Sequence, residues 1–263
     1  MTSAVDMATT IDGVEIDMSN EALRGTPKRG GGRPSGGDYR LADGTRVPSV
    51  TTILGVYKDP GPLTRWAYQI GLRQGYAQGR DGTPPAGLYA DRAAEIGSVV
   101  HDAAEHVIHG ASAEDALRLA LGSERGRELT DEQRERARQS LSAFVEWWDM
   151  VSPEVVATET PLVSERYRYG GTNDCVARLG RSRTLAVLDW KTGRGVYVEY
   201  KLQLSALAEL WEENFGERIE RAHCLRFDKR DGGFTHEMVP DLRRWFRAFL
   251  HLRDAYRIMY ERD

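Results

Sequence analysis

The segment from Leu185 to Thr192 constrains the fold more than any other part of the chain. It reads Leu-Ala-Val-Leu-Asp-Trp-Lys-Thr, so an apolar run typical of a buried strand carries an acidic and a basic side chain at its end. Asp189 and Lys191 are two residues apart and therefore share one face of the strand. Burying both charges is costly, so the pair indicates either an ion pair at a strand end or a site with chemistry to perform.

The hydrophobic pattern changes near residue 150. Before this point apolar side chains recur at helical spacing, and after it Val, Thr, Tyr and Leu gather in short runs typical of strands. The predicted helices cover 48–70, 91–108, 113–121, 131–150, 198–214 and 241–260, and a loop covers 79–87. The predicted strands cover 155–163, 167–179, 184–190, 221–227 and 233–239, with turns at Gly170-Gly171 and 180–182 and a short hairpin over 39–47.

This order of elements predicts a single α/β domain over residues 38–263, with a mixed central sheet flanked by helices. Within it, residues 38–150 form a mainly helical subregion that covers the active-site cleft, and residues 151–263 form the sheet core and the C-terminal helix. Residues 1–37 are rich in Gly and Pro and poor in apolar side chains, so we expect a flexible N-terminal tail.

Composition excludes some classes of protein. No apolar run approaches the roughly 18 residues that span a bilayer, and the acidic N-terminal stretch lacks the pattern of a secretory signal. We therefore expect a cytoplasmic protein without membrane association. The net charge of −4 does not indicate nucleic-acid binding, although basic groups can still line a local groove.

Asp174 supplies a second carboxylate near the Asp-x-Lys strand. It ends the sequence Gly170-Gly-Thr-Asn-Asp on the preceding strand, and a tight hairpin would place it beside Asp189. Two nearby carboxylates repel, and a divalent cation is the usual reason for a protein to tolerate them. The alternative is that Asp174 is a turn residue after glycines, but the sequence Val176-Ala-Arg-Leu that follows favours a strand.

Other candidate site residues fall on predicted helices. His101 ends the sequence Gly97-Ser-Val-Val-His, and Glu105 lies one turn later on the same helix face. Gln203 lies at the start of the helix that follows the Asp-x-Lys strand, where an amide can contact a phosphate or a water molecule. Taken singly, a helical histidine is more often structural, and a glutamine here is more often a surface residue.

Four motifs follow one another in the chain, namely Gly-x-x-x-His, Gly-x-x-Asp, Asp-x-Lys and Gln-Leu-x-Ala. In this order they resemble the RecB-like branch of the PD-(D/E)xK nucleases, which implies a restriction-endonuclease-like αβββαβ core. This branch includes the mitochondrial genome maintenance exonuclease. The opening Val47-Pro-Ser-Val-Thr-Thr-Ile-Leu, with Leu63 and Trp66 beyond it, is similar to phage-type exonucleases of the branch. The resemblance covers residues 39 to about 227.

The resemblance implies a metal centre. His101, Asp174 and Asp189 would bind the metal, and the carbonyl oxygen of Trp190 would be a further ligand. The expected cofactor is Mg²⁺ or Mn²⁺, as one or two ions. Several relatives hold an iron–sulfur cluster on four cysteines, which this chain cannot do because it has only two.

The resemblance also implies catalytic roles. Lys191 would be the catalytic lysine, assisted by Asp189 and Asp174, and Gln203 a supporting polar residue. Glu159 matches an accessory acidic position, and Glu105 is a further accessory candidate. The family often has tyrosine four residues after the glutamine, where this chain has Leu207, so any role of that tyrosine is absent or displaced.

Two groups of residues are candidates for DNA contacts. Ser49, Thr51 and Thr52 at a predicted helix start would either bind a DNA phosphate or cap the helix. The aromatic group would either stack single-stranded bases or pack in the core, and its members are Tyr57, Trp66, Tyr68 and Tyr76.

The expected function is metal-dependent exonuclease cleavage of single-stranded or end-frayed DNA in phage or bacterial replication, recombination or repair. A structure-specific endonuclease with the same centre is one alternative. A second is a non-catalytic DNA-binding protein on a nuclease fold, although no motif residue has been lost. A zinc hydrolase that uses His101, His106 and His109 is disfavoured, because these residues lack the His-Glu-x-x-His spacing.

Overall fold

The computed structural model describes residues 10–11, 14–15, 39–56, 87–192, 197–227 and 233–261. For the first two pairs and for residues 87–94 the description is confined to the backbone. The short pairs are strands β1 (Thr10–Ile11) and β2 (Val14–Glu15), which run antiparallel inside the segment expected to be a tail. The tail stays a prediction, because the rest of that segment lies outside the described residues.

A five-stranded mixed sheet, with strand order β3-β4-β5-β6-β7, forms the centre of the fold. Neighbouring strands are antiparallel except β5 and β6, which are parallel. Helix α7 (Val198–Phe215) joins these two, because parallel strands need a long crossover connection. The strands are β3 (Glu154–Ser164), β4 (Tyr169–Leu179), β5 (Thr184–Lys191), β6 (Arg221–Phe227) and β7 (Phe234–Val239). The predicted mixed sheet is confirmed.

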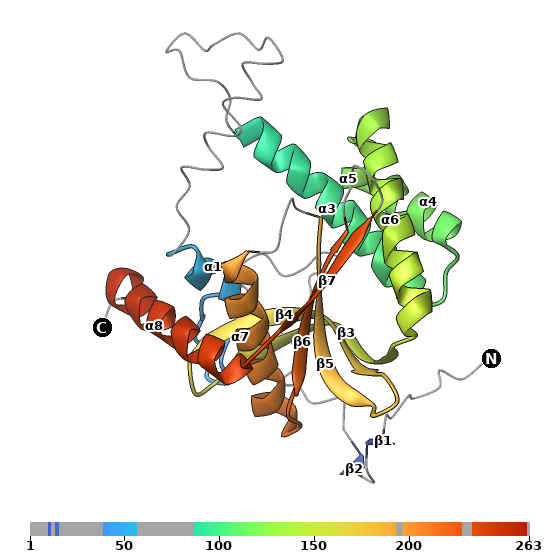
Figure 1. Cartoon of the computed structure of the whole chain (residues 1–263). Helices are drawn as coiled ribbons and strands as arrows, with labels where there is room; N and C mark the ends of the chain where they lie inside the picture. Colours follow the sequence, from blue (N-terminus) through green and yellow to red (C-terminus); the bar gives the residue numbers. More distant parts are fainter. Residues whose placement is uncertain are drawn as a thin grey trace, which may run out of the picture.

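Helices lie on both sides of this sheet (Figure 1). One side carries α7 with α1 (Val50–Leu54) and α8 (Leu242–Tyr260). The other side carries α3 (Gly87–Ile108), α4 (Ala113–Gly122), α5 (Glu124–Arg127) and α6 (Asp131–Val151). Within the described part of the chain, none of these helices combines the length and apolar character needed to cross a membrane.

Strand β5 lies between two hydrophobic clusters. Its residues from Thr184 to Trp190 are all buried, and their side chains alternate between the two sides of the sheet. Val187 packs with residues of α7 and α8, whereas Leu188 packs with residues of α3 and α6. Cover on both faces explains the unbroken apolar run, and the prediction of a buried strand is confirmed.

Some predicted element bounds need correction. Helix α3 begins at Gly87 and not near Asp91, and the four-residue α5 was not predicted. The helix predicted over 48–70 is shorter in the structure, where α1 begins at Val50 with Ser49 as its N-cap and ends at Leu54 with Gly55 as its C-cap. The part predicted over 57–70, and nearly all of the loop predicted over 79–87, lie outside the described residues.

The turn predicted at Gly170-Gly171 is wrong. The turn lies over 165–168, and both glycines belong to β4. A Cβ atom at Gly170 would overlap the side chain of Tyr39, and one at Gly171 would lie 2.6 Å from Cδ2 of Leu207 in α7. Glycine is therefore required here because neighbouring elements pack closely against the strand.

We predict that Gly170→Ala destabilises the protein by about 1–3 kcal/mol, the usual cost of overpacking a close contact. Gly122→Ala is the matched control, because a Cβ atom at Gly122 meets no atom within 4 Å. Urea unfolding of both variants measures the difference. Equal stability of the Gly170→Ala variant and the wild type would contradict the close approach of Tyr39 to β4.

A pair of histidines connects β6 and β7 near α6. The indole N–H of Trp147 donates to Nδ1 of His236 at 3.3 Å, so neutral His236 carries its own proton on Nε2. That group donates to Nδ1 of His223 at 2.7 Å. Burial, with His236 and Arg221 nearby, lowers the pKa of His223 to about 4, and burial also lowers the pKa of His236.

This pair predicts a loss of stability in mild acid. The pKa of His223 is lower in the folded chain than in the unfolded one, so its contribution is complete above about pH 6.5 and is lost as the pH falls toward 4. The loss attributable to His223 between pH 7 and pH 5 is about 2 kcal/mol. His223→Gln should reduce the pH dependence of urea unfolding, and His251→Gln, at an exposed position on α8, is the matched control. The same pH dependence in wild type and His223→Gln would contradict this account.

Candidate active site

The candidate site is built around the backbone N–H and C=O groups of Trp190, where β4 and β5 separate. The pairing of these strands ends at Cys175 and Leu188. Beyond it, the backbone N–H of Trp190 donates to Oδ2 of Asp174 at 3.0 Å. The carbonyl oxygen of Trp190 lies 3.0 Å from Nε2 of His101 in α3. The side chains of Asp174 in β4 and His101 in α3 thus form hydrogen bonds with the two backbone groups of Trp190. These groups would otherwise have continued the backbone pairing of β5 with β4.

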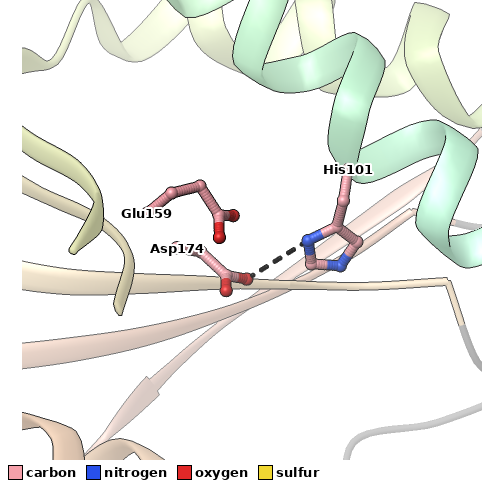
Figure 2. A group of neighbouring side chains, drawn as sticks. All are labelled: His101, Glu159 and Asp174. Carbon is pink, nitrogen blue, oxygen red and sulfur yellow. Dashed lines mark ion pairs between the residues drawn. The ribbon is translucent and has the colours of Figure 1, made fainter. Parts of the chain in front are cut away.

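Three possible metal ligands converge beside the backbone of Trp190. His101 comes from α3, Glu159 from β3 and Asp174 from β4, and Figure 2 shows their side chains directed toward one another. One ligand atom from each lies within 4.8 Å of those of the other two. Nδ1 of His101 is 3.5 Å from Oδ2 of Asp174, which is almost fully buried.

The hydrogen bonds of His101 fix the orientation of its lone pair. A carbonyl oxygen can only accept, so Nε2 carries the proton that bonds to Trp190. In the neutral ring Nδ1 is then unprotonated and faces the carboxylate of Asp174, which is also an acceptor. Two facing acceptors need a cation between them, either a proton or a metal ion. Metal-binding histidines characteristically donate their other ring N–H to a carbonyl or carboxylate, as His101 does here.

Glu159 reaches the cluster through an unusual backbone conformation. The strand pairs on either side of it, made by Thr158 and Thr160, place it opposite Asp174 in β4. Its φ is +42°, in the left-handed region that a glutamate rarely adopts inside a strand. Such a conformation costs about 1–3 kcal/mol and tends to occur at functional sites.

Asp189 and Lys191 form a second group beside the cluster. Nζ of Lys191 lies 2.6 Å from Oδ2 of Asp189, and Nε2 of Gln203 donates to Oδ1 at 3.3 Å. Asp189 is 1% exposed, whereas the side chain of Lys191 retains 17% exposure. Asp189 is not part of the three-residue cluster, so its expected role as a metal ligand stays a prediction.

Electrostatics keep Lys191 charged. Burial raises the pKa of Asp189 and the nearby Asp174 adds to the rise, while the charge of Lys191 opposes it. For Lys191, burial works against the charged form, but the two aspartates outweigh it and hold the pKa above its ordinary value. Lys191 is therefore an ammonium ion at neutral pH, suited to donate hydrogen bonds and to shield negative charge.

Other sequence-predicted residues lie outside the cluster. Glu105 lies one turn beyond His101, with Oε1 3.9 Å from Nε2 of the exposed His109. Ser49 accepts a hydrogen bond from the backbone N–H of Thr52 at 3.0 Å, so its capping role is confirmed and DNA contact stays a prediction. Thr51 and Thr52 also bond to the Ser49 hydroxyl. The aromatic candidates lie outside the described residues, namely Tyr57, Trp66, Tyr68 and Tyr76.

Sequence reasoning missed one residue of the site and one buried polar residue that precedes Asp174 in β4. The ring of Tyr200 lies 5.0 Å from Nζ of Lys191, and spacing of three residues from Gln203 on one helix face would have indicated it. Asn173, next to Asp174, is 1% exposed, and its side-chain polar atoms find no hydrogen-bond partner among the described residues. Because buried amides are normally bonded, we expect a water molecule or ligand atom there. Leu207 is a core residue against Gly171.

The donor set fits a divalent cation. It offers one imidazole nitrogen and carboxylate oxygens from Glu159 and Asp174, at mutual distances that a single ion can bridge. Carboxylates suit Mg²⁺ and Mn²⁺, and the imidazole shifts the preference toward Mn²⁺ and other softer ions.

Comparison with known protein families gives one match. The model of the PD-(D/E)XK nuclease superfamily matches residues 65–261, which is most of the chain and includes the whole candidate site. The chain therefore belongs to the PD-(D/E)XK nuclease superfamily. Members of this superfamily use divalent metal ions. No curated protein sequence matches the chain.

Solved structures give remote similarities. The alkaline exonuclease LHK-Exo from Laribacter hongkongensis has 14% identity and a TM-score of 0.30, covering 62% of this chain and 91% of that one. A complex of LHK-Exo with dAMP gives 15% identity and a TM-score of 0.29, with the same coverage. The protein SSO0001 gives 12% identity and a TM-score of 0.32, covering 77% and 86%.

The cluster predicts that Mn²⁺ raises the Tm of the wild-type protein. Binding to the folded state alone contributes about 2.7 kcal/mol when the free ion is at 100 times its Kd. His101→Ala and Glu159→Gln should each lose most of this shift, and His251→Ala on α8 should keep it. Thermal unfolding with Mn²⁺ and with EDTA checks this. Wild-type shifts in the two cluster variants would show that the ion binds elsewhere.

Proposed function

We propose that this protein is a metal-dependent deoxyribonuclease of the RecB-like branch that degrades DNA from its ends. The observation that carries the proposal is the assembly of two groups around the backbone of Trp190. The His101–Glu159–Asp174 cluster lies on one side of Trp190, and the Asp189–Lys191 pair flanks it along β5. This combines a metal-binding donor set with a fixed cation, and both can stabilise the charge that develops during hydrolysis of a phosphodiester.

In the proposed reaction, a divalent cation held by His101, Glu159 and Asp174 supplies a Lewis acid for the scissile phosphate. Lys191 orients the attacking water and shields the charge that develops on the phosphate oxygens. Asp189 keeps the ammonium group in place, and Gln203 holds the other oxygen of that carboxylate. A bond forms between the water oxygen and phosphorus while the water gives up a proton to solvent, the bond to the sugar oxygen breaks, and that oxygen takes a proton from solvent.

The substrate and setting follow from the motifs. The resemblance to phage-type exonucleases supports action on single-stranded or end-frayed DNA, in phage or bacterial replication, recombination or repair. The imidazole in the donor set supports a preference for Mn²⁺ over Mg²⁺. We also propose a cytoplasmic location.

End dependence is tested with linear and circular DNA, single- and double-stranded, in the presence of Mn²⁺. We expect linear single strands to be degraded while circular single strands of the same sequence survive. An Asp174→Asn preparation controls for contaminating nuclease. Rapid loss of the circles with the wild-type protein alone would establish the endonuclease alternative, and no cleavage of any substrate would favour the non-catalytic one.

Lys191→Ala should lower kcat by about two to three orders of magnitude, the scale of one electrostatic contact in a transition state. DNA affinity should change little, because the proposed contacts of the lysine strengthen only during reaction. Lys201→Ala is the matched control, since Lys201 on α7 pairs with Glu237 and not with the site. Cleavage by Lys191→Ala at the wild-type rate would remove this lysine from the mechanism.

A further inference from the structure

Two tyrosines extend the candidate site along the start of α7. The ring of Tyr200 lies over the ammonium group of Lys191, with 5.0 Å between Nζ and the ring centroid. The ring of Tyr197 meets that of Tyr200 edge to face, with centroids 5.6 Å apart and an angle of 73°. Tyr200 therefore bridges the catalytic lysine and Tyr197.

The side chain of Tyr197 is exposed to solvent, although burial of its apolar surface would stabilise the folded protein. The residue is 46% exposed, and the neighbouring Val198 is 47% exposed, so an aromatic and an aliphatic side chain meet solvent together. Tyr197 is the N-cap residue of α7, but its side chain makes no capping hydrogen bond. The helix start therefore does not require this ring.

We propose that Tyr197 is a nucleobase-binding residue, on which a base of the DNA strand stacks while its phosphate occupies the site beside Lys191. The inference rests on the proposed function, which places a phosphodiester at that lysine. Base stacking on an aromatic side chain needs a ring that is exposed, held in one orientation and close to the path of the backbone. Tyr197 is exposed, Tyr200 orients its ring, and the contact of Tyr200 with Lys191 places both next to the reacting phosphate.

Tyr200 is a positioning residue in this arrangement. Its ring is partly buried between Lys191 and Tyr197, so it fixes the ammonium group and the stacking surface relative to each other. The requirement is for an aromatic ring and not for a hydroxyl group. Tyr200→Phe should therefore keep the wild-type kcat and KM, whereas Tyr200→Leu should lower kcat and raise KM together. Wild-type kinetics of the Tyr200→Leu variant would overturn the positioning role.

The stacking role is tested by binding, without cleavage. Fluorescence anisotropy in EDTA measures the Kd of labelled single-stranded oligonucleotides that carry one abasic nucleotide at each near-terminal position in turn. In the wild type, one position should weaken binding by about 5- to 150-fold, the range for loss of one stacked base. Tyr197→Ala should weaken binding of the intact oligonucleotide by the same factor and show no further loss at that position. Tyr197→Phe should bind like the wild type.

Tyr260→Ala is the matched control, because Tyr260 is 65% exposed at the far end of α8. It should retain the wild-type pattern at every position. Wild-type affinity and abasic sensitivity in Tyr197→Ala would overturn the stacking role while leaving the proposed nuclease intact. Failure of the wild-type protein to bind any oligonucleotide would overturn both this inference and the proposed DNA substrate.

Discussion

The hydrogen bond between His101 and the carbonyl oxygen of Trp190 joins the helical subregion to the sheet at the place where chemistry is proposed. It links α3 to β5, and it leaves Nδ1 of His101 facing the carboxylates of Asp174 and Glu159. Without this contact, α3 would present an ordinary helical histidine. With it, the backbone groups of Trp190 fix two of the three candidate ligands, His101 from α3 and Asp174 from β4, and Glu159 joins them from β3.

The burial of the acidic side chains makes this arrangement costly in free energy. Asp174 and Asp189 are each at most 3% exposed, and charged carboxylates at such depth are unfavourable unless a cation or hydrogen bonds compensate them. Asp189 is compensated by Lys191 and Gln203, and Asp174 by the N–H of Trp190. The left-handed backbone of Glu159 adds a further cost at the same place. Several features that each lower the stability of the folded state are expected to occur together at a functional site, where function and not stability has determined the residues.

The sequence was sufficient for the features that depend on local pattern. The apolar run through β5 predicted a strand buried on both faces, and the spacing of Asp189 and Lys191 placed them together on one face. From the sequence, Glu159 could be predicted only as an accessory acidic residue. Its place in the cluster depends on the register of β3 against β4 and on a φ of +42°. Gly170 and Gly171 were mistaken for a turn, since the side chains that exclude a Cβ atom come from Tyr39 and Leu207, both more than 30 positions away. The two glycines depend on contacts between distant segments, and Glu159 depends on strand register and backbone conformation; hydrophobic periodicity reports neither.

The central claim is that His101, Glu159 and Asp174 hold the metal ion of a nuclease. Anomalous diffraction from crystals soaked in Mn²⁺ tests it most directly, because the signal locates the ion without reference to activity. The account predicts a manganese peak bounded by Nδ1 of His101 and by carboxylate oxygens of Glu159 and Asp174, with Nε2 of His101 still bonded to Trp190. A peak that excludes Glu159 or His101, or no peak in this cluster at saturating Mn²⁺, would contradict it.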